Sequence, residues 1–123
     1  MKFTLDSAPG VHLIKSYSPA GIKVGEQLLT RSCIVTATRL VTDFAPESFA
    51  DFGPAHLPVL FELSPELVIL GTGPAQHFAP AAVRAAFAAR GIGLEAMELG
   101  AACRTYNVLV QEERRVAAAL FLR

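Results

Sequence analysis

The spacing of the hydrophobic positions changes near the middle of the chain. Before Phe44, short runs rich in β-branched residues alternate with Gly- and Pro-containing turns at 18–21 and 25–26. This pattern predicts short β-strands joined in hairpins, because β-branched side chains pack well on a pleated sheet and Gly and Pro favour turns. We expect strands at residues 11–17, at 22–24, over 32–38 with 27–30 leading into it, and at 39–42.

Two short helical segments are expected next. Pro46 stands where the first residue of a helix would be, and the segment that it opens ends at Gly53, a residue suited to follow a helix. The second segment covers residues 55–63 and carries its leucines on one side. Pro58 lies within it, which a helix tolerates only near its first turn.

From residue 66 onward, apolar runs alternate with amphipathic stretches. Residues 66–70 form an apolar run without alternation, which is typical of a strand covered on both faces. The pattern continues with a helix at 81–90, a strand at 93–97, a helix at 100–111 and a strand at 115–122. A β–α–β–α–β order predicts a largely parallel sheet with helices packed on it. We therefore expect one α/β domain over residues 1–123, with the N-terminal half as an antiparallel β layer or edge.

Composition excludes several classes of protein. With 123 residues, 52% of them hydrophobic and 18% charged, the chain is long enough to bury a core and too apolar to be intrinsically disordered. The formal net charge is zero, so the basic excess typical of nucleic-acid binders is missing, and we expect no nucleic-acid partner.

Signals for targeting and for cofactors are equally sparse. Residues 1–6 lack the apolar run of a secretory signal, and the longest apolar stretch, 116–122, is too short to cross a bilayer. Cys33 and Cys103 stand alone, and the three histidines have no neighbouring ligands at metal-binding spacing. We expect a cytoplasmic protein with reduced thiols, no membrane insertion, no metal and no cofactor.

The charges are unevenly distributed along the chain. Residues 1–39 carry a net charge of +3, residues 40–83 carry −5 with no Lys or Arg, and residues 84–123 carry +2. One interpretation is a pair of complementary faces for a protein partner. The other is ordinary solvated surface, where isolated charges contribute little.

A first candidate site is the glycine-rich segment Gly71, Thr72 and Gly73, which directly follows the predicted strand 66–70. Ligands of open α/β sheets bind beyond the carboxyl ends of the strands, where glycines allow close approach and helix starts attract anions. However, Gln76 replaces the third glycine of a dinucleotide fingerprint, and no Lys follows as in a P-loop. A structural tight turn is therefore the competing interpretation.

A second candidate site lies near the start of the last helix. It comprises Cys103, Arg104, Thr105, Tyr106 and Asn107. A thiol near a helix N-terminus beside an arginine can have a lowered pKa and act as a nucleophile, whereas most free cysteines are small buried hydrophobes. Tyr106 is expected in the core. Asn107 is unusual in mid-helix, and we hypothesise that it ties this helix to the Gly71–Gly73 turn.

Three stretches resemble one protein family. They are PELVILGTG at 65–73, AACRTYNVL at 101–109 and EERRVAAAL at 112–120. This family consists of small bacterial, archaeal and mitochondrial proteins of largely unknown function, the Mth-type domain, and its best-known member is an assembly factor of mitochondrial respiratory complex I. The resemblance implies a three-layer α/β fold with a mixed central sheet. It implies no catalytic residues, because none are established for the family.

Two positions depart from the family pattern. Met97 is followed by Glu98 and Leu99, where members usually carry an acidic residue and then Thr. The turn before the last strand has Glu113 where members usually carry glycine. The first change alters a polar contact at the helix start, and the second indicates that the turn tolerates a side chain.

Two functions are therefore open. The first is a non-enzymatic domain that binds a protein partner and assists assembly of a membrane or respiratory complex. The alternative is a protein or enzyme that binds a small anion or nucleotide between Gly71–Gly73 and the Cys103–Asn107 helix start. No catalytic residue is nominated.

Overall fold

The N-terminal strands form a small sheet of their own. In the computed structural model, which describes residues 10–123, this sheet has the antiparallel order β1-β2-β3. Its strands are β1 (Ile14–Ser18), β2 (Gly21–Val24) and β3 (Gln27–Leu29). The expected hairpins are confirmed, but the prediction that 27–30 leads into a strand over 32–38 is wrong, because β3 and the next strand, Cys33–Val35, belong to different sheets. Residues 1–6, where we expect no secretory signal, lie outside the described residues.

A second, five-stranded sheet has the order β5-β4-β8-β6-β7. β6 pairs in parallel with both β7 and β8, whereas β4 pairs antiparallel with β8 and with β5. The strands are β4 (Cys33–Val35), β5 (Leu40–Val41), β6 (Leu67–Thr72), β7 (Gly93–Met97) and β8 (Val116–Phe121). The C-terminal half thus supplies the expected parallel part, and the N-terminal half adds an antiparallel edge, so the mixed sheet is confirmed.

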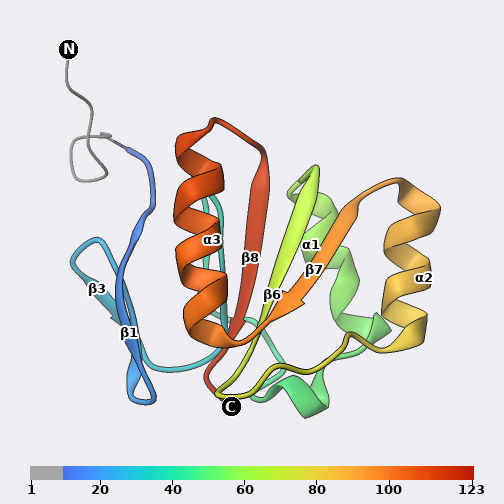
Figure 1. Ribbon diagram of the computed structural model, residues 1–123, viewed down its shortest axis with the longest axis horizontal. Coiled ribbons are helices and arrows are strands. Elements are labelled where there is room, and N and C mark those ends of the chain that lie inside the picture. Colours follow the sequence, from blue (N-terminus) through green and yellow to red (C-terminus); the bar gives the residue numbers. More distant parts are fainter. Residues whose placement is uncertain (1–9) are drawn as a thin grey trace.

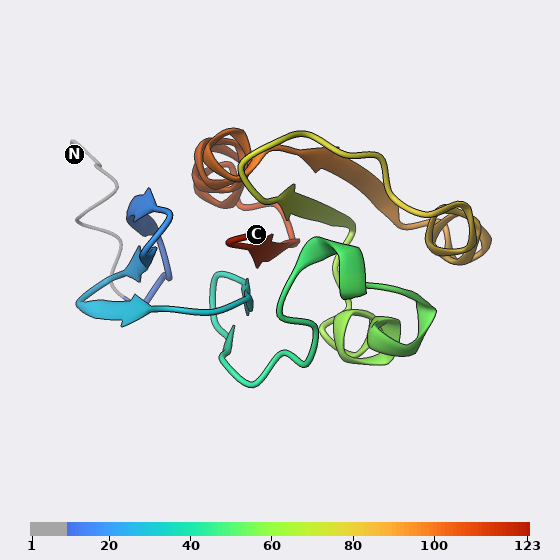
Figure 2. The same ribbon diagram turned by 90° about the horizontal axis from the view of Figure 1, so that it is seen from below.

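Helices cover both faces of the five-stranded sheet, as Figure 2 shows, with the sheet between α3 and α1. One face carries α3 (Leu99–Gln111), and the three-stranded sheet packs beside this helix (Figure 1). The other face carries α1 (Leu57–Glu62), α2 (Ala81–Arg90) and two 3₁₀ turns, η2 (Phe49–Asp51) and η3 (Pro54–His56). The structure is the α/β arrangement that the sequence predicts.

Alternate residues of the two central strands supply two separate cores. Ile69 and Leu120 pack toward α3, while Val68 and Ala119 pack toward α1 and α2. All four side chains are completely buried. A strand covered on both faces needs no polar alternation, which explains the continuous apolar runs in β6 and β8.

The prediction of a helix from Pro46 to Gly53 is wrong, because this segment contains only the turn η2. The carbonyl oxygen of Pro46, which would accept the first helical hydrogen bond, accepts one from the buried Ser32 hydroxyl instead. Phe49 and Phe52 both pack on Phe121, with ring centroids 5.4 Å apart in each case. Aromatic packing therefore determines the path of this segment.

The helix over 81–90 has the predicted bounds, and Gly91 follows it in the left-handed conformation with φ of 68°. Pro58 lies in the first turn of α1, as expected. None of the helices in the described part of the chain has the length and apolar character needed to span a bilayer.

Candidate functional site

The first candidate segment is part of a strand and only its last residue lies in a loop. Gly71 and Thr72 are the final residues of β6 and pair with Leu120 and Phe121 of β8, so the prediction that the loop begins at Gly71 is wrong. The strand continues because the apolar run of β8 extends far enough to pair with it. Gly73 alone leaves the strand, with φ of 89°.

All three of these residues make internal contacts. A Cβ added at Gly71 would lie 3.0 Å from the Ala102 side chain, so the glycine lets α3 pack closely on β6. The buried Thr72 hydroxyl donates to the carbonyl oxygen of Ala75 at 2.7 Å and accepts from the N–H of His77 at 3.1 Å. A Cβ at Gly73 would lie 3.3 Å from the Cα of Arg123.

The N-terminus of α3 is occupied by a carboxylate of the chain itself. Glu98 precedes the helix, and its two carboxylate oxygens accept hydrogen bonds from the N–H groups of Gly100 at 2.8 Å and Ala101 at 2.7 Å. These are the groups that would otherwise attract an anion. The next residue, Leu99, is buried in the core, which accounts for the apolar side chain at that position.

The side chain of Arg104 and the first turn of α3 contact the three-stranded sheet. Tyr17 of β1 covers Gly100, where an added Cβ would overlap the tyrosine ring. The guanidinium of Arg104 donates to the Tyr17 hydroxyl at 2.8 Å and lies 3.8 Å from the Glu98 carboxylate. Arg104 is therefore turned toward Tyr17 and Glu98 and not toward the thiol of Cys103.

Tyr106 and Asn107 hold the N-terminal segment against α3. The buried Tyr106 hydroxyl donates to the carbonyl oxygen of His12 at 2.7 Å. The Asn107 side chain accepts from the N–H of Ile14 at 2.9 Å and donates to the Ile14 carbonyl oxygen at 2.8 Å. Asn107 thus binds the backbone as a neighbouring strand would.

The hypothesis that Asn107 ties α3 to the Gly71–Gly73 turn is therefore wrong. At 1.5 Å per residue, Asn107 lies more than two helical turns from the start of α3, where β6 ends. Thr105, on the same helix, is half-buried, and its side chain makes no hydrogen bond with residues 10–123.

The interpretation of Cys103 as an activated thiol is also wrong. Its side chain is buried in the core, and desolvation raises the pKa of the thiol to about 12, outweighing the opposite effect of the Arg104 charge. Cys33 is in the same core, and burial raises the pKa of its thiol to about 12 as well. Both cysteines are free.

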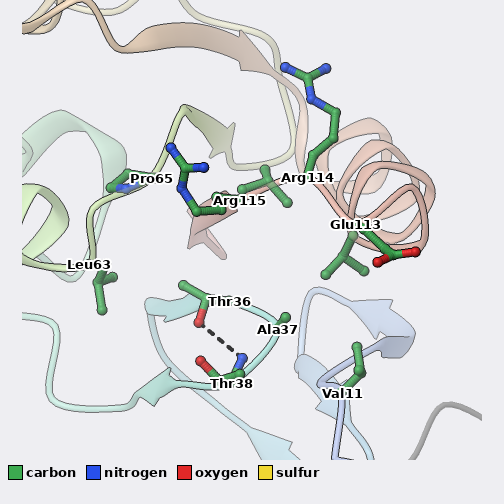
Figure 3. A pocket seen from close by; sticks show the side chains of 11 residues that line it. Val11, Thr36, Ala37, Thr38, Leu63, Pro65, Glu113, Arg114 and Arg115 are labelled. Atoms are coloured by element: carbon green, nitrogen blue, oxygen red, sulfur yellow. Dashed lines mark hydrogen bonds between the residues drawn. The ribbon is translucent and has the colours of Figure 1, made fainter.

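A pocket that sequence reasoning missed lies at the opposite end of the five-stranded sheet (Figure 3). Its volume is about 360 Å³, and it opens where β6 and β8 begin and where α3 ends. Glu113 on its wall has a φ of 61°, a left-handed conformation that favours glycine. The sequence does contain a signal for this strained turn, because Glu113 stands where members of the family usually carry glycine. The lining residues are Val11, Thr36, Ala37, Thr38, Leu63, Pro65, Val110, Glu113, Arg114, Arg115 and Val116.

The structure is an α/β fold in which the 101–109 motif stabilises the packing of α3 and the N-terminal segment. The sequence profile of the family described as "Protein of unknown function (DUF498/DUF598)" matches residues 14–121. The chain therefore belongs to this family, and the resemblance seen in the sequence is confirmed.

Relatives with solved structures have the same fold. A Xanthomonas campestris protein is 41% identical with a TM-score of 0.83, and the match covers 90% of this chain and 84% of that one. A Bordetella pertussis protein described as a Mth938-like domain is 26% identical with a TM-score of 0.83, covering 98% of this chain and 92% of that one.

The name of a longer relative states a function. The zebrafish (Danio rerio) protein "NADH dehydrogenase [ubiquinone] 1 alpha subcomplex assembly factor 3" is 32% identical over 110 residues, which are 88% of this chain and 63% of that protein. This chain therefore spans less than two thirds of the length of the assembly factor that it resembles.

Replacing Asn107 tests whether it fastens the N-terminal segment. In Asn107→Ala, the N–H and carbonyl groups of Ile14 lose their partners, and we expect the free energy of unfolding to fall by about 1–3 kcal/mol. Urea denaturation followed by circular dichroism measures this change. Val108→Ala, which truncates a neighbouring exposed side chain, is the control and should change stability by about 0.5 kcal/mol or less. Equal stability of the two variants would contradict the assigned role of Asn107.

The buried thiols predict a loss of stability at alkaline pH. Their pKa rises on folding from an ordinary 9.0 to about 12, so the folded state holds protons that the unfolded state releases. This contribution is complete below pH 9 and is lost as the pH rises toward 12. The variant with both Cys33→Ala and Cys103→Ala should therefore lose less stability than the wild type over this range. Parallel curves of stability against pH would show that the thiols do not contribute.

Proposed function

We propose that this chain is a protein-binding domain that assists assembly of a respiratory or other membrane-bound complex. Family membership and the similarity to the zebrafish assembly factor support the assembly role. The alternative, a small anion or nucleotide bound between Gly71–Gly73 and the Cys103–Asn107 helix, lacks support because internal contacts occupy most of those groups, as described above.

The structural observation that carries the proposal is the exposure of Phe78. Its side chain is 84% exposed, the largest exposed fraction of any large hydrophobic residue at positions 10–123. Phe78 lies in the loop between β6 and α2. Aromatic side chains on a surface are frequent anchors of protein–protein interfaces.

Contacts on both sides of Phe78 fix the loop that presents it. The N–H of His77 donates to Thr72, and the His77 ring stacks on Phe49 with centroids 6.0 Å apart. Ala79 is buried, and its carbonyl oxygen accepts from the side chain of Arg84 at 3.2 Å. A loop held in this way loses less conformational entropy on binding, which favours a docking role for Phe78.

Charged side chains of both signs lie beside this loop. Phe49, which stacks on His77, belongs to η2, and the same turn carries the exposed Asp51. On the other side of Phe78, the side chain of Arg84 donates to the carbonyl oxygen of Ala79. Complementary charge steers association and excludes partners of the wrong sign.

Replacing Phe78 tests the proposal directly. We expect affinity-tagged wild-type chain, expressed at native level in its host, to recover subunits of a respiratory membrane complex from solubilised membranes. Phe78→Ser should reduce this recovery about tenfold, because it removes an anchor residue without disturbing the core. Quantitative mass spectrometry measures the recovered subunits.

Leu28→Ser is the matched control. Leu28 is 59% exposed, and it lies on β3 in the other sheet, so this variant should recover the same subunits as the wild type. Thermal unfolding of all three proteins verifies that each is folded. Equal recovery by the wild type and Phe78→Ser, or no enrichment of subunits of any membrane-bound complex by the wild type, would contradict the proposal.

A further inference from the structure

The pocket at the end of α3 has apolar walls on several sides. Leu63 and Pro65 lie on one side and Val11 on another, with Ala37 opposite Arg115 (Figure 3). Val110 and Val116 complete the apolar lining. A volume of about 360 Å³ lies within the range of about 300–1,000 Å³ that small-molecule sites occupy. The pocket is therefore large enough for a small molecule with an apolar body.

Arg115 on the wall retains unused hydrogen-bonding capacity and, unlike Arg114, forms no ion pair with residues 10–123. The Nε of Arg115 donates to the carbonyl oxygen of Ser64 at 3.4 Å, and its two terminal nitrogens make no hydrogen bond with residues 10–123. Glu66 is close enough for its charge to act on this arginine, but its carboxylate oxygens contact other groups. One accepts the backbone N–H of Arg115 at 2.9 Å, and the other lies 3.6 Å from the guanidinium of Arg114.

The other polar groups of the pocket also leave room for an acceptor. Thr38, across the pocket from Arg115, has a hydroxyl that makes no hydrogen bond within the described chain. The Thr36 hydroxyl, by contrast, accepts from the N–H groups of Thr38 and Arg39. The carboxylate of Glu113 points away from Arg115 in Figure 3. Arg115 therefore supplies the charged donors of this wall, and its guanidinium lies beside Pro65 (Figure 3).

We propose that this pocket binds an organic carboxylate with an apolar body. The planar guanidinium fork of Arg115 matches a carboxylate, and the apolar walls would bury the rest of the ligand. A phosphate group would need more positive charge, because the second arginine of the pocket is already close to Glu66. A free fatty acid and the carboxyl terminus of a peptide both have this chemistry.

Titration of the full chain with sodium octanoate, followed by amide NMR shifts, tests the site. We expect saturable shifts at residues of the pocket wall such as Ala37 and Val116. Octanol, which keeps the apolar body without the charge, should bind at least about tenfold more weakly, because it loses the charge-assisted hydrogen bonds. A peptide ending in a free C-terminal leucine and its C-terminal amide form the second arm. Tighter binding of the free-acid peptide than of octanoate assigns the site to a chain terminus, and the reverse assigns it to a free acid.

Two variants and a control make the test specific. Arg115→Gln should weaken octanoate binding about tenfold or more, and Ala37→Leu should weaken it by filling the apolar part of the pocket. Arg31→Gln removes an exposed arginine that lies 3.8 Å from Glu47 outside the pocket, and it should bind as the wild type does. The proposal is overturned if neither octanoate nor the free-acid peptide binds, if octanol binds equally well, or if Arg115→Gln retains full affinity.

Discussion

The packing of α3 on β6 and β8 is the constraint on which the rest of the structure depends. Gly71 has no side chain, so Ala102 of the helix reaches the strand backbone, and a Cβ at Gly71 would also lie 3.0 Å from the Leu120 side chain. Added volume in such a contact forces shifts that cost about 1–3 kcal/mol. The same helix then carries Tyr106 and Asn107 to the backbone of the N-terminal segment. One helix therefore joins the two sheets.

This arrangement changes how the most recognisable motif of the family is interpreted. Its cysteine fills the core, its tyrosine and asparagine bind backbone groups, and Glu98 occupies the N–H groups at the helix start. Functional contacts are better sought at side chains that are exposed or that have donors without an internal hydrogen-bond partner. Phe78 is exposed on a fixed loop, and Arg115 in the wall of a pocket has two terminal nitrogens that make no hydrogen bond within the described chain. These two places lie at different ends of the sheet, and each supports its own proposal.

Local signals predicted much of the fold. Pro80 and Gly91 mark the two ends of α2 because proline suits a helix start and glycine suits the residue after a helix. The unbroken apolar runs predicted β6 and β8 as buried strands. The prediction of a helix after Pro46 was wrong because the phenylalanines of this segment pack on the distant strand β8 and the carbonyl oxygen of Pro46 accepts a hydrogen bond from Ser32. No local pattern encodes these contacts. The partner of Asn107 was missed for the same reason, since Ile14 is 93 residues away.

The candidate site was harder to predict than the fold. A glycine-rich segment after a strand suggests a ligand loop, yet close helix packing requires glycine equally. Only the pairing of Gly71 with Leu120 distinguishes the two roles, and that pairing is a property of the folded sheet. The pocket arises from segments around residues 37, 64 and 115, which only the fold brings together.

Hydrogen exchange at the amide of Ile14 tests most directly whether α3 holds the two sheets together. This N–H donates to the Asn107 side chain and not to a strand, so its protection reports on the contact between α3 and the N-terminal sheet. The structure predicts that Ile14 exchanges with an opening free energy close to that of Tyr106 in the middle of α3. Exchange of Ile14 at the rate of an unstructured peptide, while Tyr106 remains protected, would show that the helix does not hold the two sheets together.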